Sequence, residues 1–489
     1  MQPAPSSATS VVPRLIALWA LVGGALLALA GVLLSFRHRF DWALELRDIP
    51  ALPLMIGLIA AGLVFLGVLP LIARTVGIAH PRLHRRLLWL VIGVGLVLRL
   101  MILPTEPALE DDQQRYLWEG ALVANGLSPY ALAPNDTWSA PAGSPLDRLA
   151  GAAGPVLERV NHPGLKTIYP PVAEAAFALA YVLKPFSLTA WRLVLLAADM
   201  VTLGLLLHVL DAAGRPRLWS ALYWWNPLVI KEVFNSGHME GVLTPFVLGA
   251  LVLSIRRRPL LATGVLGLGV GVKIWPLLLL PLILRPVLHR PRMVVGALAI
   301  MAAMVALWAL PILMGGLDAR SGFRAYAADW QANSALLPAL RGLLEGLLAT
   351  FGQPVGTAGM VARLALAITA GLVALATVRA PLQGAADVMA RAAVVTLALV
   401  LLSPAQFPWY AIWTIPFLPF APRWGVMAMA VLLPIYYASF HFAALGRPEI
   451  FRGQVVWLVW LPIWLLLACD AWVAWRARRR AGPITAATA

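Results

Sequence analysis

The chain reads LLWLVIGVGLVLRLMILP over residues 87–104 and EDDQQRYLWEG over residues 110–120. The first stretch is apolar and approaches the roughly 20 residues that a membrane-spanning helix needs, so the acids of the second stretch lie where a span gives way to water. Because like charges resist ionising together, at least one of Glu110, Asp111 and Asp112 should have a raised pKa and be able to act as a base. The alternative is that these acids only begin a helix, since Asp and Glu favour the first turn.

The composition of the whole chain is that of a polytopic membrane protein. Of its 489 residues, 61% are hydrophobic and 12% are charged, whereas a soluble chain is about one quarter charged. The net charge is +16, but the Arg residues stand in short clusters between apolar runs, as the positive-inside rule predicts for cytoplasmic loops. We therefore expect no nucleic-acid partner, and the cluster at residues 478–480 is interpreted as a cytoplasmic anchor. The single cysteine, Cys469, excludes an intrachain disulfide.

Apolar runs that alternate with basic clusters predict the topology. We expect an all-α polytopic membrane protein in a single integral-membrane domain, residues 1–489, with a bundle of about 11–13 transmembrane helices and several short re-entrant or half-membrane helices. The first apolar run, residues 15–36, is too long for a secretory signal and should remain as an uncleaved anchor. Residues 412–420 are expected to cross back to the cytoplasm.

One long polar loop interrupts the apolar runs. Residues 105–169 carry eight acidic against four basic residues, which is the wrong balance for a cytoplasmic loop. Long ordered loops are usually functional. We therefore expect residues 105–170 to form a large first periplasmic loop that carries catalytic groups, and residues 315–334 to form a second periplasmic loop.

Three apolar segments are short for full spans. The segment after Pro171 extends only to Lys184 and is expected to lie in the membrane interface or to dip into the membrane and return. The second short apolar segment should form a hairpin, and the turn of that hairpin, residues 235–241, should point outward. Residues 259–284 are flanked by Arg on both sides, so we expect a re-entrant hairpin with Lys273 at its tip, facing the outer side. The rival interpretation is a single full span, which would leave one Arg cluster outside.

Short motifs extend over most of the chain, from about Leu100 to Ala444. In chain order they are Asp112, Tyr116, Gly120, Gly126, Ser128-Pro129-Tyr130, Tyr169-Pro170-Pro171, Asn226-Pro227, Gly237-His238-x-Glu240-Gly241, Lys273 with Pro276, and Ser403-Pro404 with Pro408-Trp409-Tyr410. As an ordered set they resemble the GT-C integral-membrane glycosyltransferases, most closely bacterial mannosyltransferases that use polyprenyl-phosphate-mannose and more distantly the GPI-anchor mannosyltransferases. The chain departs from the family pattern at Met239-Glu240, where Asp or Asn is expected after His238.

The resemblance implies a GT-C-like bundle and the transfer of a hexose, most closely mannose, from a polyprenyl-phosphate donor. The acceptor would be a hydroxyl group of a glycan, a glycolipid or a lipid. The resemblance also implies the inner (cytoplasmic) membrane of a bacterium, with the active site facing the periplasm. The partners are then the polyprenyl-phosphate-linked sugar donor, the glycan or lipid acceptor, and membrane lipids.

The resemblance points to Asp112 as the general base that deprotonates the acceptor hydroxyl. General-base help of this kind contributes about 10²- to 10⁴-fold to a rate. Asp111 is the second predicted catalytic residue, as a neighbour that raises the pKa of Asp112 or binds a metal. Adjacent carboxylates could hold Mg²⁺ or Mn²⁺, whose preferred ligands are oxygens, so Asp111 and Asp112 are also the candidate metal ligands. No cofactor is certain from the sequence.

The leaving phosphate requires cations, and Lys273, His238 and Arg324 are the predicted phosphate-binding residues. A charged Lys inside a membrane costs at least about 2.5 kcal/mol, so Lys273 calls for a partner unless it snorkels to the headgroup region. Arg324 lies in the second polar loop, where it could instead be solvated. Lys231, near a span end, is expected to snorkel.

Other side chains of the motifs could contact substrate by stacking on a sugar ring or by hydrogen bonding. Most of the 20 Trp residues should nevertheless lie at membrane interfaces. The series Gly267-x-Gly269-x-Gly271 resembles a dinucleotide loop, but it lies in an apolar helix without a preceding strand, where small residues favour helix packing. The predicted substrate-binding residues are Tyr116, Tyr130, Tyr169, Glu240, Gln406, Trp409, Tyr410 and His441.

Two other functions use the same residues. A transporter or lipid flippase would place Lys273 and His238 along a substrate path, but the chain has no paired halves with broken helices in matching positions. A polymerase or ligase of lipid-linked glycans would share the site chemistry and transfer whole oligosaccharides.

Overall fold

The structure is a computed structural model that describes residues 8–480, and its regular elements are all helical. Eight helices among these residues are long and apolar enough to cross a membrane, or nine if one bent pair counts as a further span. The predicted fold class, an all-α polytopic membrane protein, is therefore confirmed.

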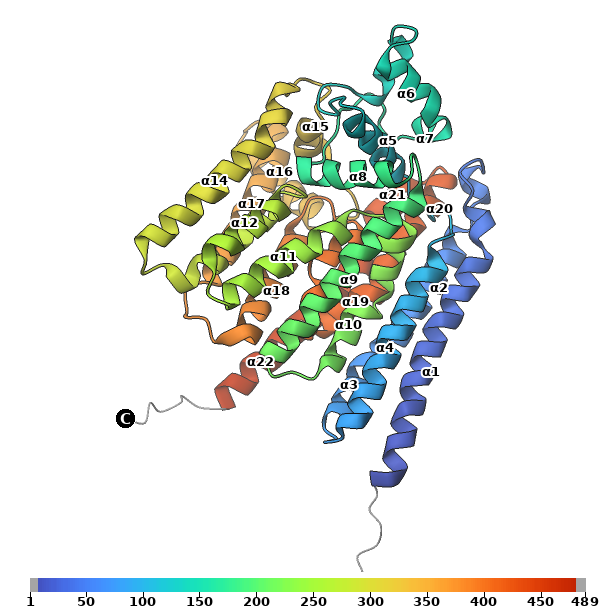
Figure 1. The fold of residues 1–489 in the computed structure, drawn as a ribbon. Coiled ribbons are helices and arrows are strands. Elements are labelled where there is room, and N and C mark those ends of the chain that lie inside the picture. Colours follow the sequence, from blue (N-terminus) through green and yellow to red (C-terminus); the bar gives the residue numbers. More distant parts are fainter. Residues whose placement is uncertain (1–7, 481–489) are drawn as a thin grey trace, which may run out of the picture.

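Long helices run side by side through the molecule (Figure 1). They are α1 (Ala8–Ser35), α2 (Ala51–Leu66) continued by α3 (Val68–Val76), α4 (Pro81–Ile102), α9 (Leu188–Ala212), α14 (Pro291–Met314), α17 (Ala358–Ala376), α18 (Gly384–Leu402), α19 (Trp424–Leu432) continued through η11 (Leu433–Tyr437) by α20 (Ala438–Ala444), and α22 (Val456–Arg480).

Shorter helices belong to the two polar loops or complete the bundle. In Figure 1, α5, α6 and α7 lie together above one end of the long helices. Those of the polar loops are α5 (Asp112–Ala124), η3 (Pro134–Ser139), α6 (Pro145–Ala153), α7 (Pro155–Glu158) and α15 (Gly322–Asp329). The others are η1 (Arg37–Phe40), η2 (Leu46–Asp48), α8 (Pro171–Leu183), η4 (Arg217–Ser220), α10 (Ala221–Trp224), η5 (Val229–Asn235), α11 (Glu240–Ile255), α12 (Pro259–Val270), η6 (Trp275–Leu279), α13 (Leu280–Leu284), η7 (Arg285–Val287), α16 (Leu336–Thr350), η8 (Val355–Thr357), η9 (Pro408–Trp413), η10 (Ile415–Phe417), α21 (Pro448–Ile450) and η12 (Phe451–Val455).

Helix α4 carries four arginines, one of which lies inside the bundle. The Nε atom of Arg99 donates to Oδ2 of Asp199 on α9 at 2.6 Å, and its guanidinium lies 3.4 Å from the ring centre of Trp224 on α10. A charge buried in this way must be paired, because an unpaired one costs several kcal/mol. The pair thus fixes α4, the helix whose C-terminal end leads to the acidic stretch, against α9 and α10.

The half-span segments fold largely as predicted. Helix α8 is short and lies across the direction of the long helices (Figure 1). The predicted turn at residues 235–241 is a sharp bend, because the π-helix η5 and α11 meet at 118°. Helix α12 packs against both η6 and α13, so the chain folds back near Lys273. The predicted fold-back at Lys273 is therefore present, and residues 259–284 do not form one continuous helix.

Residues 412–420 connect the cavity end of the bundle to its opposite end, as predicted, but without a continuous helix: Trp413 lines the cavity, and the Pro419 carbonyl accepts a hydrogen bond from Arg215, beyond the far end of α9, at 2.7 Å. This stretch consists of the 3₁₀ turns η9 and η10 and packs against α11 and α18. Proline lacks a backbone N–H and clashes with the preceding helical turn, so Pro408 and Pro416 prevent a continuous helix. The η9 turn contributes to the wall of the cavity described below.

Helices α5 and α8 pack closely at Gly120, which has no side chain. A Cβ atom added at Gly120 would lie 2.4 Å from the carbonyl oxygen of Phe177. Overpacking of this kind costs about 1–3 kcal/mol, so we expect Gly120→Ala to lower the midpoint of thermal unfolding in detergent. Gly151→Ala is the matched control, because no atom lies within 4 Å of its added Cβ in α6. Equal midpoints for the two variants would contradict the close packing of α5 on α8.

Candidate active site

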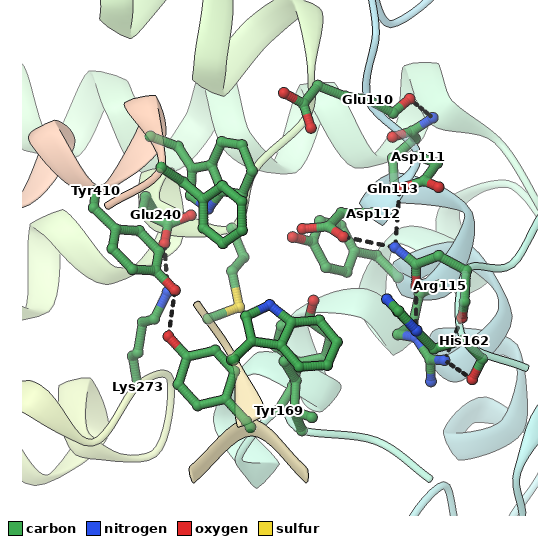
Figure 2. Close-up of a pocket in the computed structure, with 18 of the residues that line it drawn as sticks. Glu110, Asp111, Asp112, Gln113, Arg115, His162, Tyr169, Glu240, Lys273 and Tyr410 are labelled. Atoms are coloured by element: carbon green, nitrogen blue, oxygen red, sulfur yellow. Dashed lines mark hydrogen bonds and ion pairs between the residues drawn. The ribbon is translucent and has the colours of Figure 1, made fainter. Parts of the chain in front are cut away.

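A cavity of about 810 Å³ lies where the first polar loop meets one end of the bundle. This volume is in the range of small-molecule sites, which are about 300–1,000 Å³. Figure 2 shows Glu240, Lys273 and Tyr410 on one side of the cavity and Asp111, Asp112 and Arg115 on the other. Of the predicted site residues, those that line it are Asp111, Asp112, Tyr116, Tyr169, Glu240, Lys273, Trp409 and Tyr410.

The acidic side of the cavity begins helix α5. Asp111 precedes the helix, and its side chain makes no capping hydrogen bond. The Nδ2 atom of Asn161 donates to Oδ1 of Asp111 at 2.9 Å and to Oδ1 of Asp112 at 2.8 Å. The two carboxylates are thereby fixed side by side, with Asp112 facing the cavity.

Asp112 has the raised pKa that the acidic stretch predicts. Its pKa is raised to about 6, first by burial and second by the charge of Asp111, while the hydrogen bond from Asn161 opposes the shift. The prediction gave the like charge as the cause, but removal from water is the larger contribution. A carboxylate with this pKa is both ionised near neutral pH and basic enough to accept a proton.

Arg115 fixes the loop that carries Asn161. Its guanidinium donates to the carbonyl oxygens of Asn161 at 2.5 Å, His162 at 2.9 Å and Leu165 at 3.2 Å. It also pairs with Glu119 one turn along α5, at 2.9 Å. The amide of Asn161 is therefore held against Asp112 by the same helix that carries Asp112.

We expect Asn161→Ala to reduce the turnover of whatever reaction Asp112 assists. Because the amide orients both carboxylates, its loss should lower kcat by roughly 10- to 100-fold with little change in KM. Asn125→Ala is the matched control, since the Asn125 amide bonds only the Ala121 carbonyl at the far end of α5. The same kcat for both variants, measured on protein of equal monodispersity, would show that Asn161 does not orient the base.

The basic side of the cavity is an ion pair. The Nζ atom of Lys273 lies 2.7 Å from Oε1 of Glu240, and it lies 4.4 Å and 4.9 Å from the ring centres of Tyr410 and Trp413. Glu240 is fully buried, whereas the Lys273 side chain is 22% exposed and reaches the cavity. Lys273 therefore has the ion-pair partner that a charged lysine among apolar helices requires, and it does not snorkel. Glu240, at the position where the chain departs from the family pattern, is that partner.

His238 lies beside Asp112 but behind the cavity wall. Its ring stacks on Trp409 with centres 3.9 Å apart, and its Nδ1 atom is 3.7 Å from Oδ2 of Asp112. The imidazole is completely buried. Its nearest charged groups include the carboxylates of Glu110 and Glu232, at 3.8 Å and 3.7 Å. These surroundings do not suit the predicted contact with a phosphate, because carboxylates repel an anion.

Besides His238, four predicted site residues do not line this cavity. The hydroxyl of Tyr130 donates to the Tyr169 carbonyl at 3.0 Å. The amide of Gln406 donates to the carbonyls of Val400 and Leu401 at the end of α18. Their polar groups thus satisfy the backbone. The other two are Arg324, which is exposed on α15, and His441, which is half-buried on α20.

Sequence reasoning missed a group of residues behind Asp112. Lys231 does not snorkel as expected, because its Nζ atom contacts Ser236 Oγ at 2.6 Å and the Tyr437 hydroxyl at 2.7 Å in the interior. The same hydroxyl donates to Glu232 at 2.8 Å. Two adjacent charges in an apolar arm, Lys231-Glu232, were the available signal, since such charges are rare inside membranes unless they serve a function.

The rest of the cavity is largely apolar and aromatic. Trp330 and Tyr169 contribute rings on which a sugar could stack. Next to Lys273, the wall continues into apolar side chains of η6 and α14 and their neighbours. These are Val270, Ile274, Leu277, Val305, Trp308, Ala309 and Ile312.

Comparison with known proteins relates the chain to glycosyltransferases. The model of glycosyltransferase family 87 matches residues 167–404, which include Glu240 and Lys273 and begin after Asp112. The protein named GPI mannosyltransferase 1 from Gibberella zeae is 38% identical over 96 residues, which are 19% of this chain and 22% of that relative. No solved structure matches the chain. The predicted resemblance to GT-C integral-membrane glycosyltransferases is confirmed, and both matches cover only part of the chain.

Proposed function

We propose that this chain, which the family 87 model matches over residues 167–404, transfers a hexose from a polyprenyl-phosphate donor to an acceptor hydroxyl. The hexose proposed is mannose, and the acceptor is a glycan, a glycolipid or a lipid. One observation carries the proposal: a single cavity is lined both by the carboxylate of Asp112, with its raised pKa, and by the ammonium of Lys273. Group transfer needs a base for the acceptor and a cation for the leaving phosphate in the same cavity. The family match favours group transfer over transport.

The donor proposal rests on what surrounds Lys273. A polyprenyl phosphate has an anionic head and a long apolar tail. The Lys273 ammonium faces the cavity, and the next residue, Ile274, is 70% exposed. Leu277 is 37% exposed on the same wall. Large exposed apolar side chains next to a cation suit a lipid tail in the membrane with its phosphate at the lysine.

The proposed reaction is a displacement at the anomeric carbon of the donor. The acceptor hydroxyl gives its proton to the Asp112 carboxylate, and its oxygen forms the new bond to that carbon. The bond from the carbon to the phosphate oxygen breaks, and polyprenyl phosphate leaves with the bonding electrons. Lys273 stabilises the charge that develops on this phosphate, which is the kind of electrostatic help that contributes most in a water-poor site. Glu240 keeps the ammonium in place.

Purified protein in nanodiscs tests the donor class. Polyprenyl-phosphate-mannose and GDP-mannose, each carrying a radiolabelled sugar, are supplied with lipid extracts as acceptors, and labelled products are separated chromatographically. The proposal expects transfer from the polyprenyl donor alone, with one polyprenyl phosphate released for each sugar. Transfer from the sugar nucleotide alone, or movement of the intact donor across the bilayer without transfer, would overturn it.

We further propose a bacterial inner-membrane location with the cavity facing the periplasm, because basic clusters alternate with the polar loops along the chain. Labelling of introduced cysteines tests this location and requires exposed positions, so the fully buried Ser236 and Gln406 are unsuitable. In a Cys469→Ser background, cysteine at Trp138, which is 78% exposed, should react with an impermeant maleimide in intact cells.

Cysteine at Arg82 or at Arg290 should react only after the membrane is opened, because both residues are exposed in basic loops assigned to the cytoplasm. Cysteine at Arg324 should behave like cysteine at Trp138. The reverse pattern of labelling would place the cavity on the cytoplasmic side and contradict the proposed location.

A further inference from the structure

Three potential metal ligands converge behind the wall that carries Asp112. They come from the loop before α5 (Glu110), the π-helix η5 (Glu232) and the bend before α11 (His238). One ligand atom from each lies within 4.8 Å of the other two. Among these residues only Glu110 also lines the cavity. The cluster is thus separate from the pair Asp111 and Asp112, which Asn161 holds together.

The imidazole of His238 indicates that the cluster binds a ligand. The ring is completely buried, and neither of its nitrogens has a hydrogen-bond partner. A buried polar atom left without a partner costs about 1–3 kcal/mol, so proteins rarely leave one in place without a reason. Its Nε2 atom faces Oε2 of Glu110 at 3.8 Å and Oε2 of Glu232 at 3.7 Å. These distances are too long for hydrogen bonds and leave room for an ion between the three atoms.

The neighbouring residues hold both carboxylates in this orientation. The Tyr437 hydroxyl lies 3.2 Å from Oε1 of Glu110 and 2.8 Å from Oε1 of Glu232, and it is held in turn by Lys231 at 2.7 Å. Ser236 adds a contact of 3.3 Å to Oε2 of Glu232. The second oxygen of each carboxylate is thereby turned toward the histidine. Outer contacts of this kind orient the ligands of metal sites and are needed for full affinity.

The region also has more negative than positive charges. Glu110, Glu232, Asp111 and Asp112 carry four negative charges when ionised, and Lys231 contributes one positive charge beside them. The other nearby cation, Lys273, is paired with Glu240. A divalent cation would offset two of the three remaining negative charges, and buried charges require such compensation.

We infer that Glu110, Glu232 and His238 bind a divalent cation, Mn²⁺ or Zn²⁺. Two carboxylate oxygens and one imidazole nitrogen suit these ions, while Mg²⁺ prefers oxygen ligands and keeps several waters. With the ion on Nε2, the proton of His238 lies on Nδ1 and faces Oδ2 of Asp112, 3.7 Å away. The ion would therefore fix the tautomer of His238 and hold its imidazole beside Asp112, on the side away from the cavity. It would not contact the sugar. The inference rests on this geometry and does not depend on which donor the enzyme uses.

Metal analysis and pulsed electron paramagnetic resonance test the site on the full-length protein in detergent. After removal of metals by a chelator and loading with Mn²⁺, wild-type protein should retain about one ion per chain through gel filtration. Its spectrum should contain the coupling of one imidazole nitrogen. His238→Gln should lose that coupling, and Glu232→Gln should lose most of the bound ion. Tyr437→Phe should weaken binding by about 10- to 100-fold, because it removes an outer contact only.

Glu174→Gln is the matched control, since Glu174 is a buried carboxylate that bonds Thr167 at 2.7 Å instead. It should retain the ion and the nitrogen coupling. If Glu232→Gln or His238→Gln does not fold, the wild-type nitrogen coupling and the milder Tyr437→Phe variant still decide the question. No retained ion in wild-type protein, or an ion without nitrogen coupling that is lost in Asp111→Asn, would overturn the inference. All of these measurements are independent of sugar transfer.

Discussion

Asp112→Asn is expected to lower sugar transfer by about 10²- to 10⁴-fold, because an amide cannot accept the proton of the acceptor hydroxyl. The amide has the shape of the carboxylate and can still bond to Asn161, so expression and the unfolding midpoint should change little. Initial rates on purified protein, at saturating donor and acceptor, measure the effect on kcat.

Asp111→Asn is the matched control for this variant. Asp111 is exposed, and Asn161 binds it through the same amide, at 2.9 Å. Its replacement removes a neighbouring charge and leaves the base, so its loss of activity should be much smaller. Wild-type rates in Asp112→Asn, or an equal loss in both variants, would contradict the assignment of Asp112 as the base.

Lys273→Met is expected to lower kcat/KM for the polyprenyl donor by about 10²- to 10³-fold, the usual loss when one preorganised group that stabilises developing charge is removed. It should also weaken binding of polyprenyl phosphate, the proposed leaving group, measured by native mass spectrometry. Lys184→Met, at an exposed lysine after α8, is the control and should change neither value.

The ion pair offers a way to separate loss of fold from loss of function. In Lys273→Met the buried carboxylate of Glu240 loses its partner, and breaking a buried pair costs about 3–5 kcal/mol. Adding Glu240→Gln removes that charge and should restore the yield of folded protein. The double variant should remain inactive. Recovery of activity together with yield would mean that Lys273 serves the fold alone.

Much of this architecture could be predicted because it depends on local composition. Apolar runs and Arg clusters indicated the membrane class, and the Arg clusters on both sides of residues 259–284 indicated the re-entrant hairpin. Their shared outward direction predicted that Asp112, Glu240 and Lys273 would meet, and all three line one cavity.

What could not be predicted depends on contacts between distant parts of the chain. Tyr437 meets Glu232 from 205 positions away, through the packing of η11 near the π-helix η5. No pattern within either segment indicates that contact. Similarly, the sequence does not say which polar side chains satisfy backbone carbonyls, so Tyr130 and Gln406 were interpreted as substrate ligands. Hydrophobicity indicated the crossing of residues 412–420 but not its form, because Pro408 and Pro416 replace a continuous helix with 3₁₀ turns.

The most direct measurement is a cryo-electron microscopy structure of Asp112→Asn bound to intact polyprenyl-phosphate-mannose. We expect the donor phosphate within ion-pair distance of Lys273 Nζ, the tail along Ile274 and Leu277, and the anomeric carbon turned toward residue 112 in the same cavity. A phosphate bound away from Lys273, or a sugar outside the cavity that Asp112 and Lys273 share, would contradict the account.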